Sequence, residues 1–404
     1  MRLAESREQR AKGRSLGLRS QSGSSLFALR APLARPGVTL IELLITIMII
    51  SILAAAVLGV AAVAGETARE AKTRTIISRL HSLLMEQYDT YANRRVKLNS
   101  NVLDEINKPT LAANTAQRGR LKAEARLYAL REMMLMEVPD RWSDVLLNSV
   151  PTTDPTSATA FDPIYLDAPP VPDLPGNPAN RTELASLYLR TFRRIASATN
   201  KISGNTNERD EILANQGAEC LYMVIMNACG DGEARTLFPE SNIGDTDGDG
   251  APEFIDGWGH PIEFLRWAPG FESDVQVNAN ELDSPPSPTT PAEAWAAAGA
   301  SDHDPFDLYR VQPAAFRLVP LIYSLGRDEE AGLYNDGTLV PWRPATFAPG
   351  LSTTGSPQYV TPALDPYVKN SGQYLNAAYT GYLATAVDRS LATDNIHNHL
   401  IGTR

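Results

Sequence analysis

The sequence predicts an α+β protein in which a long amino-terminal helix spans a membrane and packs on a head with a small antiparallel sheet and an inserted helical region. Three observations support this prediction. Residues 38–64 are apolar and long enough to cross a bilayer core, which needs about 20 apolar residues as a helix. Helical periodicity then continues to Tyr91. Two strand-like runs, residues 262–267 and 316–323, follow a series of helix-like segments.

These patterns divide the chain of 404 residues into six segments. They are a basic leader (1–37), the membrane half of the long helix (38–64), its soluble half (65–98), an inserted helical region (99–236), a sheet and acidic-loop region (237–340) and an irregular carboxy-terminal tail (341–404). The hydrophobic fraction of 43% and the charged fraction of 21% are typical of globular proteins. Within the tail, residues 372–392 are the one place where a short helix is expected.

The charge of the chain is unevenly distributed. Residues 1–37 carry a net charge of +6, so the remainder carries −16 of the total of −10. An acidic chain repels phosphate and suits divalent cations, so we expect no nucleic-acid partner. The basic flank before the apolar segment predicts a cytoplasmic amino terminus and a translocated carboxy terminus.

Three interpretations of the apolar segment compete: a secretory signal peptide cut before Gly65, a plain single-pass anchor, and a processed helix. A signal peptide has a shorter apolar region, of about 7–15 residues. Neither of the first two explains Glu42, because an unpaired carboxylate inside a bilayer costs at least a few kcal/mol, about 2.5–3.5 on insertion scales. No Lys or Arg follows within two helical turns, so we expect its partner to be another chain or a new amino terminus.

The run GVTLIEL at residues 37–43 resembles the cleavage and methylation motif of type IV pilins and type II secretion pseudopilins. In that family a membrane peptidase cuts after the Gly and methylates the new terminal amine. The resemblance implies that Gly37 ends the leader, that Val38 becomes the terminus, and that Glu42 faces the amine of a neighbouring subunit. Two departures are Val38, where the family most often has Phe, and a long leader of 37 residues.

The resemblance also implies a location and partners. The chain would be a single-pass protein of the bacterial inner membrane, with a periplasmic or extracellular head shaped like a ladle and assembled into a filament. Its partners would be other pilin or pseudopilin subunits, the prepilin peptidase, an inner-membrane assembly platform and membrane lipid. The filament would belong to a type II secretion system or to a type IV pilus.

Helical periodicity recurs beyond the membrane segment. The expected buried face of the soluble half contains Ala68, Ala71, Thr75, Ile76, Leu80, Leu83 and Leu84. Residues 111–137, 181–199 and 209–229 predict three inserted helices. Cys220 and Cys229 lie about half a turn out of phase on the last of them, so we expect buried free thiols. Residues 269–305 are expected to be loop, and Pro320 predicts an edge strand or a bulge.

The run DTDGDGAPEFID at residues 245–256 has the spacing of a calcium loop. Its candidate ligands are Asp245, Asp247, Asp249, Glu253 and Asp256, the last at a position where an EF-hand has Glu. Pro and Gly on both sides exclude flanking helices, so this would be a calcium loop without the hand. The alternative is a solvated acidic turn whose aspartates bond to their own backbone.

Two further segments, DGWGHPI at 256–262 and YSLGRD at 323–328, look like segments of major pseudopilins. In those proteins a loop near the second segment binds a structural calcium, which makes Asp328, Asn335 and Asp336 the implied ligands here. Gly257 stands where the family has Pro, and Glu329 stands where it has Gly. Glu enters a left-handed turn less readily than Gly.

Nothing in the sequence singles out an enzyme centre, because no nucleophile elbow, zinc-protease helix, P-loop or Cys-x-x-Cys motif is present. His260 lies in a Trp-Gly-x-Pro turn and has an expected structural role. The sequence therefore predicts a non-enzymatic filament subunit with structural calcium. The alternative is a membrane-tethered, calcium-dependent binding or hydrolytic domain that uses the same anchor.

Overall fold

The computed structural model forms two compact units, Met1–Ala61 and Ala62–Arg404. It describes residues 37–108, 115–146, 165–167, 181–199, 215–229, 232, 234–284, 290–335, 365–367, 369 and 381–400. Long and short helices and small antiparallel sheets make up this part of the chain, which confirms the α+β class.

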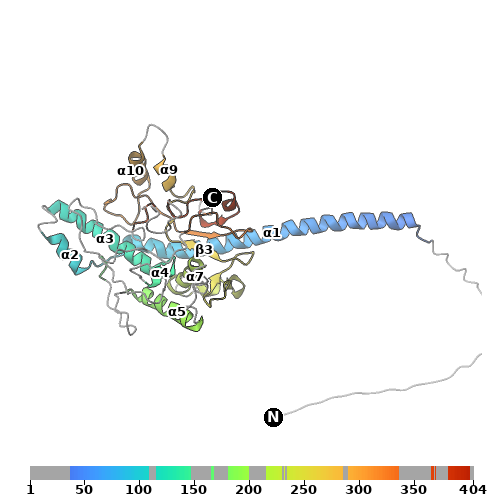
Figure 1. Cartoon of the computed structure of the whole chain (residues 1–404), viewed down its shortest axis with the longest axis horizontal. Helices are drawn as coiled ribbons and strands as arrows, with labels where there is room; N and C mark the ends of the chain where they lie inside the picture. Colours follow the sequence, from blue (N-terminus) through green and yellow to red (C-terminus); the bar gives the residue numbers. More distant parts are fainter. Residues whose placement is uncertain are drawn as a thin grey trace, which may run out of the picture. The chain divides into compact units, whose positions relative to one another are not determined.

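Helix α1 runs without a break from Leu40 to Asn93 (Figure 1). It is long and apolar enough, by length and composition, to cross a membrane. Every residue from 37 to 65 is exposed, whereas the later turns bury Thr73, Ile76, Ile77, Leu80, Leu83, Leu84, Tyr88 and Tyr91. The prediction that Ala68, Ala71 and Thr75 are buried is wrong. The other four predicted side chains, Ile76, Leu80, Leu83 and Leu84, are buried as expected. The loop after β2 packs on α1 at Thr73 rather than at Thr75.

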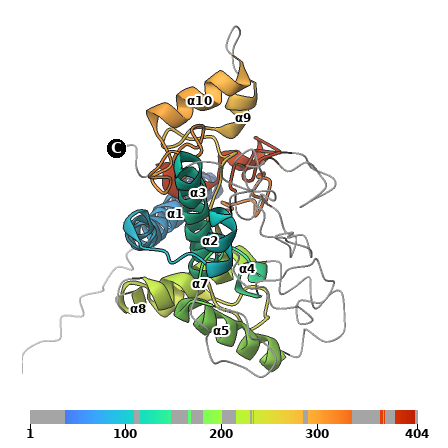
Figure 2. The ribbon, with the colours of Figure 1, turned by 90° about the vertical axis from the view of Figure 1, so that its left-hand side faces the viewer.

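The inserted region is helical, as predicted. Its helices are α2 (Ser100–Asn107), α3 (Thr115–Glu137), α4 (Trp142–Leu146), α5 (Glu183–Thr199), α7 (Gln216–Ala228) and α8 (Ala234–Leu237) (Figure 2). Helix α5 packs on α3, α4 and α7, and α7 packs on strands β2 and β3. Cys220 and Cys229 are buried and free, which confirms the expectation for both thiols.

Two small antiparallel sheets follow. Strands β1 (Ile243–Gly244) and β2 (Glu253–Phe254) pair as a hairpin after the short 3-10 helix η2 (Glu240–Asn242). Strands β3 (Ile262–Leu265), β4 (Leu321–Ser324) and β5 (Ile396–His397) form a second sheet in that order. Strand β4 lies in the middle and begins after Pro320, so the proline neither marks an edge strand nor interrupts the pairing.

Two segments are more ordered than the sequence indicated. The stretch expected to be loop contains α9 (Ala279–Asp283) and α10 (Pro291–Ser301). Thr290 and Glu293 form a reciprocal capping box around Pro291, a start signal that was readable in the sequence. The tail supplies β5 between the 3-10 helices η3 (Leu391–Thr393) and η4 (Asn398–Leu400). The described part of residues 372–392 has the first two residues of η3 and no α-helix; residues 372–380 lie outside the description.

One hydrophobic cluster joins α1, the inserted helices and the sheets. Tyr88 of α1, Tyr128 of α3, Trp142 of α4 and Phe264 of β3 all belong to it. A second cluster contains Leu265, Leu321 and Tyr323, which alternate along β3 and β4 with residues of the first. The inserted helices therefore share the core of the sheet within the unit Ala62–Arg404.

Candidate functional sites at the helix start and in the acidic hairpin

Glu42 has a hydrogen-bonding partner at the start of its own helix. The amide of Thr39 donates to Glu42 Oε2 over 2.9 Å and the Thr39 hydroxyl donates to the same oxygen over 3.0 Å. The Glu42 amide donates in return to Thr39 Oγ1 over 3.3 Å. This is a capping box, with Thr39 as N-cap and Glu42 at the third helical position. The expectation that the partner must come from outside the segment overlooked this Thr-x-x-Glu spacing.

The expected processing residues lie just before this cap. Gly37 and Val38 are exposed and extended from the helix, and no atom lies within 4 Å of the place where a Gly37 side chain would begin. None of the described residues therefore covers Gly37 where a peptidase would have to reach the Gly37–Val38 peptide bond. Residues 1–36 of the expected leader lie outside the described part.

The acidic loop connects β1 to β2, so it is a hairpin loop rather than a linker between helices. Asp245 accepts the amides of Gly248 and Gly250 at 2.8 and 3.1 Å, and Asp249 accepts the amide of Ala251 at 2.6 Å. Gly248 and Gly250 have φ of 76° and 93°, a region open to glycine. The loop thus forms the backbone-bonded turn considered as the alternative. Asp245, Asp247 and Asp249 nevertheless offer oxygens within 4.8 Å of one another.

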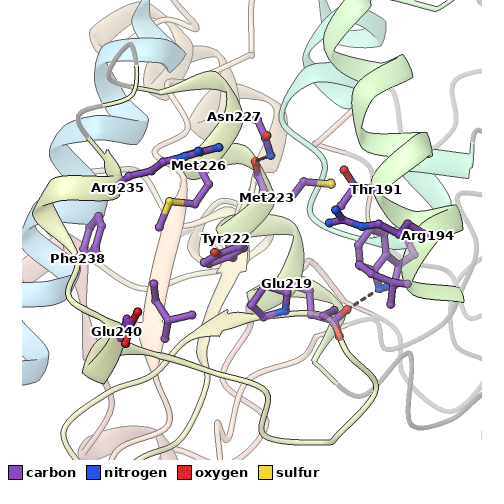
Figure 3. Close-up of a pocket in the computed structure, with 15 residues that line it drawn as sticks. Thr191, Arg194, Glu219, Tyr222, Met223, Met226, Asn227, Arg235, Phe238 and Glu240 are labelled. Carbon is purple, nitrogen blue, oxygen red and sulfur yellow. Dashed lines mark hydrogen bonds between the residues drawn. The ribbon is translucent and has the colours of Figure 1, made fainter. Parts of the chain in front are cut away.

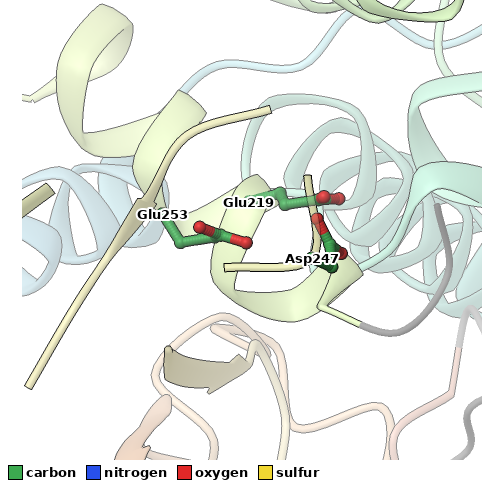
Figure 4. A group of neighbouring side chains, drawn as sticks. All are labelled: Glu219, Asp247 and Glu253. Atoms are coloured by element: carbon green, nitrogen blue, oxygen red, sulfur yellow. The ribbon is translucent and has the colours of Figure 1, made fainter. Parts of the chain in front are cut away.

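A second carboxylate group lies deeper. Glu219 of α7, Asp247 of the loop and Glu253 of β2 each offer one oxygen, and these oxygens lie within 4.8 Å of one another (Figure 4). Glu219 and Glu253 are 2% and 0% exposed. Sequence reasoning missed Glu219, because it lies far from the loop in the chain. The available signal was a single carboxylate inside the otherwise apolar run GAECLYMVIM.

Like charges dominate the electrostatics of this group. Burial raises the pKa of Glu219 well above its usual value, and Asp249, Asp247 and Glu253 add to the shift. Burial raises the pKa of Glu253 to about 7, and Asp247 contributes through repulsion. Burial also raises the pKa of nearby Glu263 to about 8, with Glu253 as a further cause. Each carboxylate therefore disfavours the ionised form of its neighbours.

Asp256 has a different role from the other predicted ligands. Its Oδ1 accepts the amides of Trp258, Gly259 and His260 at 2.8, 2.8 and 3.0 Å, and its Oδ2 accepts the Ser324 hydroxyl at 2.6 Å. It organises the turn before β3 and joins it to β4. The structure does not bring it into either carboxylate group.

The same turn docks on α1. The Trp258 indole N–H donates to Glu66 Oε2 over 3.0 Å, and the Gly257 amide donates to Thr73 Oγ1 over 2.9 Å. A side-chain carbon at Gly257 would lie 2.3 Å from the Arg69 carbonyl oxygen. Glycine at this position therefore permits the close approach of the turn to the helix.

The ligands expected near the second pseudopilin-like segment are described only in part. Asp328 accepts the amide of Glu330 over 3.0 Å and belongs to neither carboxylate group of the described residues. Asp336 lies outside the described residues. Glu329 does adopt the left-handed conformation, with φ of 65°, and its Oε1 lies 2.8 Å from His260 Nε2. His260 Nδ1 lies 3.1 Å from the Gly326 carbonyl, so this histidine joins the two segments.

A cavity of about 450 Å³ opens beside Glu219 between α5, α7 and α8 (Figure 3). Arg194, Arg235 and Glu240 give it charge, and Tyr222 and Phe238 give it aromatic walls. Glu219 lies at its edge, where Oε2 accepts the Trp142 indole N–H. Elsewhere in the head, Asp304 forms a buried ion pair with Arg131 over 3.0 Å.

Comparison with known families gives one match. The model of the prokaryotic N-terminal methylation motif matches residues 34–58, the region that contains Gly37, Val38 and Glu42. This motif is the prepilin signature of type IV pilins and pseudopilins, which confirms the resemblance seen in the sequence. This match supports a type IV pilin-like or pseudopilin-like protein, and the motif together with the long apolar helix suggests a single-pass membrane anchor. No curated protein and no solved structure matches the chain.

Proposed function

We propose that this protein is a structural subunit of a type II secretion or type IV pilus-like filament, cleaved after Gly37 and assembled through its apolar helix. The methylation motif at residues 34–58 carries the proposal. The continuous exposure of residues 37–65 supports it, because an apolar helix surface of this length requires cover from lipid or from other subunits. The head would lie on the periplasmic or extracellular side of a bacterial inner membrane.

The capping box adds a step to assembly. In the isolated chain, Thr39 occupies the oxygen of Glu42 that would face a neighbour's amine. After cleavage the Val38 amine lies one residue from this cap, so the carboxylate can exchange a neutral hydroxyl for a charged partner. A terminal amine carries a positive charge that the Thr39 hydroxyl lacks, so it adds a Coulomb attraction to the carboxylate that is strongest in a medium of low dielectric constant.

Two measurements test this function. The first is the mass of the amino-terminal peptide from native membranes, which we expect to show a methylated Val38. The second is filament assembly of Glu42→Ala, with Thr39→Ala as a matched control that removes the cap but keeps the carboxylate. Assembly should be lost in Glu42→Ala and largely retained in Thr39→Ala.

Four outcomes would contradict the proposal in different ways. A mature terminus at Gly65 would indicate signal-peptide cleavage and a released head. Equal loss in both variants would reduce Glu42 to a capping residue. Normal assembly of Glu42→Ala would show that assembly does not need this carboxylate. No assembly even of the unaltered protein would favour a membrane-tethered binding domain, for which the cavity beside Glu219 offers a ligand site.

A further inference from the structure

The strongest unassigned feature of the head is the group formed by Glu219, Asp247 and Glu253, in which both glutamates are buried and Asp247 is partly buried. Three chain segments contribute to it, namely helix α7, the hairpin loop and strand β2 (Figure 4). Buried carboxylates are rare unless they are paired or bind a metal, because burial without compensation is costly. A group of three therefore requires an explanation.

Hydrogen bonds within the described chain satisfy this group only in part. Glu253 accepts the amide of Thr246 over 3.1 Å and the side-chain amide of Asn215 over 3.3 Å. Glu219 Oε2 accepts the Trp142 indole N–H, but Oε1 is buried and has no hydrogen-bond partner among the described residues. Its strongest charged neighbours, Asp249, Asp247 and Glu253, are all negative. What Glu219 lacks is a positive charge at Oε1.

The spacing of the oxygens fits one hard cation. Calcium binds oxygens at 2.3–2.6 Å, so two oxygens on one ion can be up to about 4.6–5.2 Å apart. The oxygens of the three residues lie within 4.8 Å of one another. Magnesium demands near-ideal octahedral geometry at 2.0–2.1 Å and usually keeps several waters, whereas calcium accepts several carboxylates in flexible geometry. Calcium is therefore the ion that three carboxylates from different elements suit best.

We propose that Glu219, Asp247 and Glu253 form a divalent-cation site that binds Ca²⁺ and fastens helix α7 to the β1–β2 hairpin. This assigns the ion to the inner group, which contains a residue from the inserted region, and leaves Asp245 to hold the loop through backbone amides. Of the three residues, Glu219 also lines the cavity between α5, α7 and α8. The proposal concerns the head alone and does not depend on how the amino terminus is processed.

The test uses the full-length protein in detergent micelles. Thermal unfolding is followed in EDTA and in a CaCl₂ titration, and Ca²⁺ binding is measured by calorimetry. We expect Ca²⁺ to raise the unfolding midpoint of the unaltered protein, and we expect Glu219→Gln to weaken binding at least tenfold. Because this variant also removes like-charge repulsion, its midpoint in EDTA should equal or exceed that of the unaltered protein.

Control variants separate this site from the alternatives. Asp328→Asn tests the loop implied by the pseudopilin resemblance and should leave the Ca²⁺ response unchanged. Asp245→Asn tests the outer loop group and should weaken the response less than Glu219→Gln. Glu253→Gln provides a second inner variant if Glu219→Gln does not fold.

Two results would overturn the proposal: no Ca²⁺ response in the unaltered protein, or a response that survives both inner substitutions. A response lost only in Asp328→Asn would place the ion in the other loop. A Glu219→Gln protein that folds but is less stable in EDTA would show that Glu219 is needed for the fold without an ion.

Discussion

Both halves of α1 carry large apolar side chains, but these are exposed in the first half and buried by the rest of the chain in the second. Residues 40–65 are exposed throughout, whereas the turns from Thr73 to Tyr91 carry eight side chains buried by the rest of the chain. Burying one large aliphatic side chain stabilises a protein by about 1.5–3 kcal/mol. The second half obtains this stabilisation within its own chain. The first half has no such cover from the described part of its own chain and, under the proposed function, would obtain it from lipid or from other subunits.

The largest expected difference between the halves comes from truncating one side chain in each. Leu80 is 0% exposed, so Leu80→Ala should leave a cavity and lower the free energy of unfolding of the head by about 2–5 kcal/mol. Ile50 is 64% exposed, so Ile50→Ala should leave head unfolding unchanged. Denaturant unfolding in micelles, followed by the fluorescence of the head tryptophans, measures both. Equal losses would show that the two halves unfold as one unit.

A second difference between the exposed helix and the packed head is the pH dependence of stability, which should arise from buried carboxyl groups of the head. Burial raises the pKa of Glu263 to about 8, so the folded state keeps a proton that the unfolded chain releases near pH 4.5. Between these values the folded state binds more protons, and stability therefore falls as pH rises. Glu253 and Glu219 contribute a slope of the same sign, because their pKa values are raised as well. Glu263→Gln should therefore reduce this slope and stabilise the protein at pH 9 by roughly 2–4 kcal/mol, at about 1.4 kcal/mol per pKa unit.

This measurement is made in EDTA, which separates it from ion binding. Glu272→Gln, which breaks only a surface pair with Arg389, serves as the exposed control and should keep the slope. If stability depended on pH in Glu263→Gln as it does in the unaltered protein, the raised pKa of Glu263 would not be the source of that dependence.

The smallest expected effect concerns the exposed half. Thr39→Ala removes the capping box, which should destabilise the first turn of α1 by about 1 kcal/mol. Hydrogen exchange of the amides near Leu40 should accelerate, whereas the unfolding midpoint of the head should stay constant. A shift of the head midpoint would show that the helix start is coupled to the packed half.

Sequence reasoning worked best where one local pattern determines the outcome. The apolar run, the prepilin motif and the inserted helices are local patterns with strong periodicity, and the structure contains a helix at each expected place. The two capping boxes, at Thr39 and at Thr290, were equally local and were overlooked. The α10 helix could therefore have been predicted.

The rest depends on long-range contacts that a single sequence does not display. Glu219 is adjacent to Asp247 only because α7 packs on β2. Asp256 had suitable spacing for a loop ligand, but its position beside Ser324 makes it a turn organiser. The start of the buried face of α1 was misplaced, because the turn at Gly257, from a distant part of the chain, contacts the helix at Thr73 and leaves Thr75 exposed.

The third strand of the sheet has a consequence for biogenesis. Strand β5 pairs with the middle strand β4, and Asn398 accepts the Ile322 amide and donates to the Pro320 carbonyl. Residues 396–398 leave the ribosome about seventy positions after β4, so a nascent head keeps an unpaired, aggregation-prone strand edge until then. Prematurely terminated chains would retain that edge, which would let cellular proteases distinguish them from full-length chains.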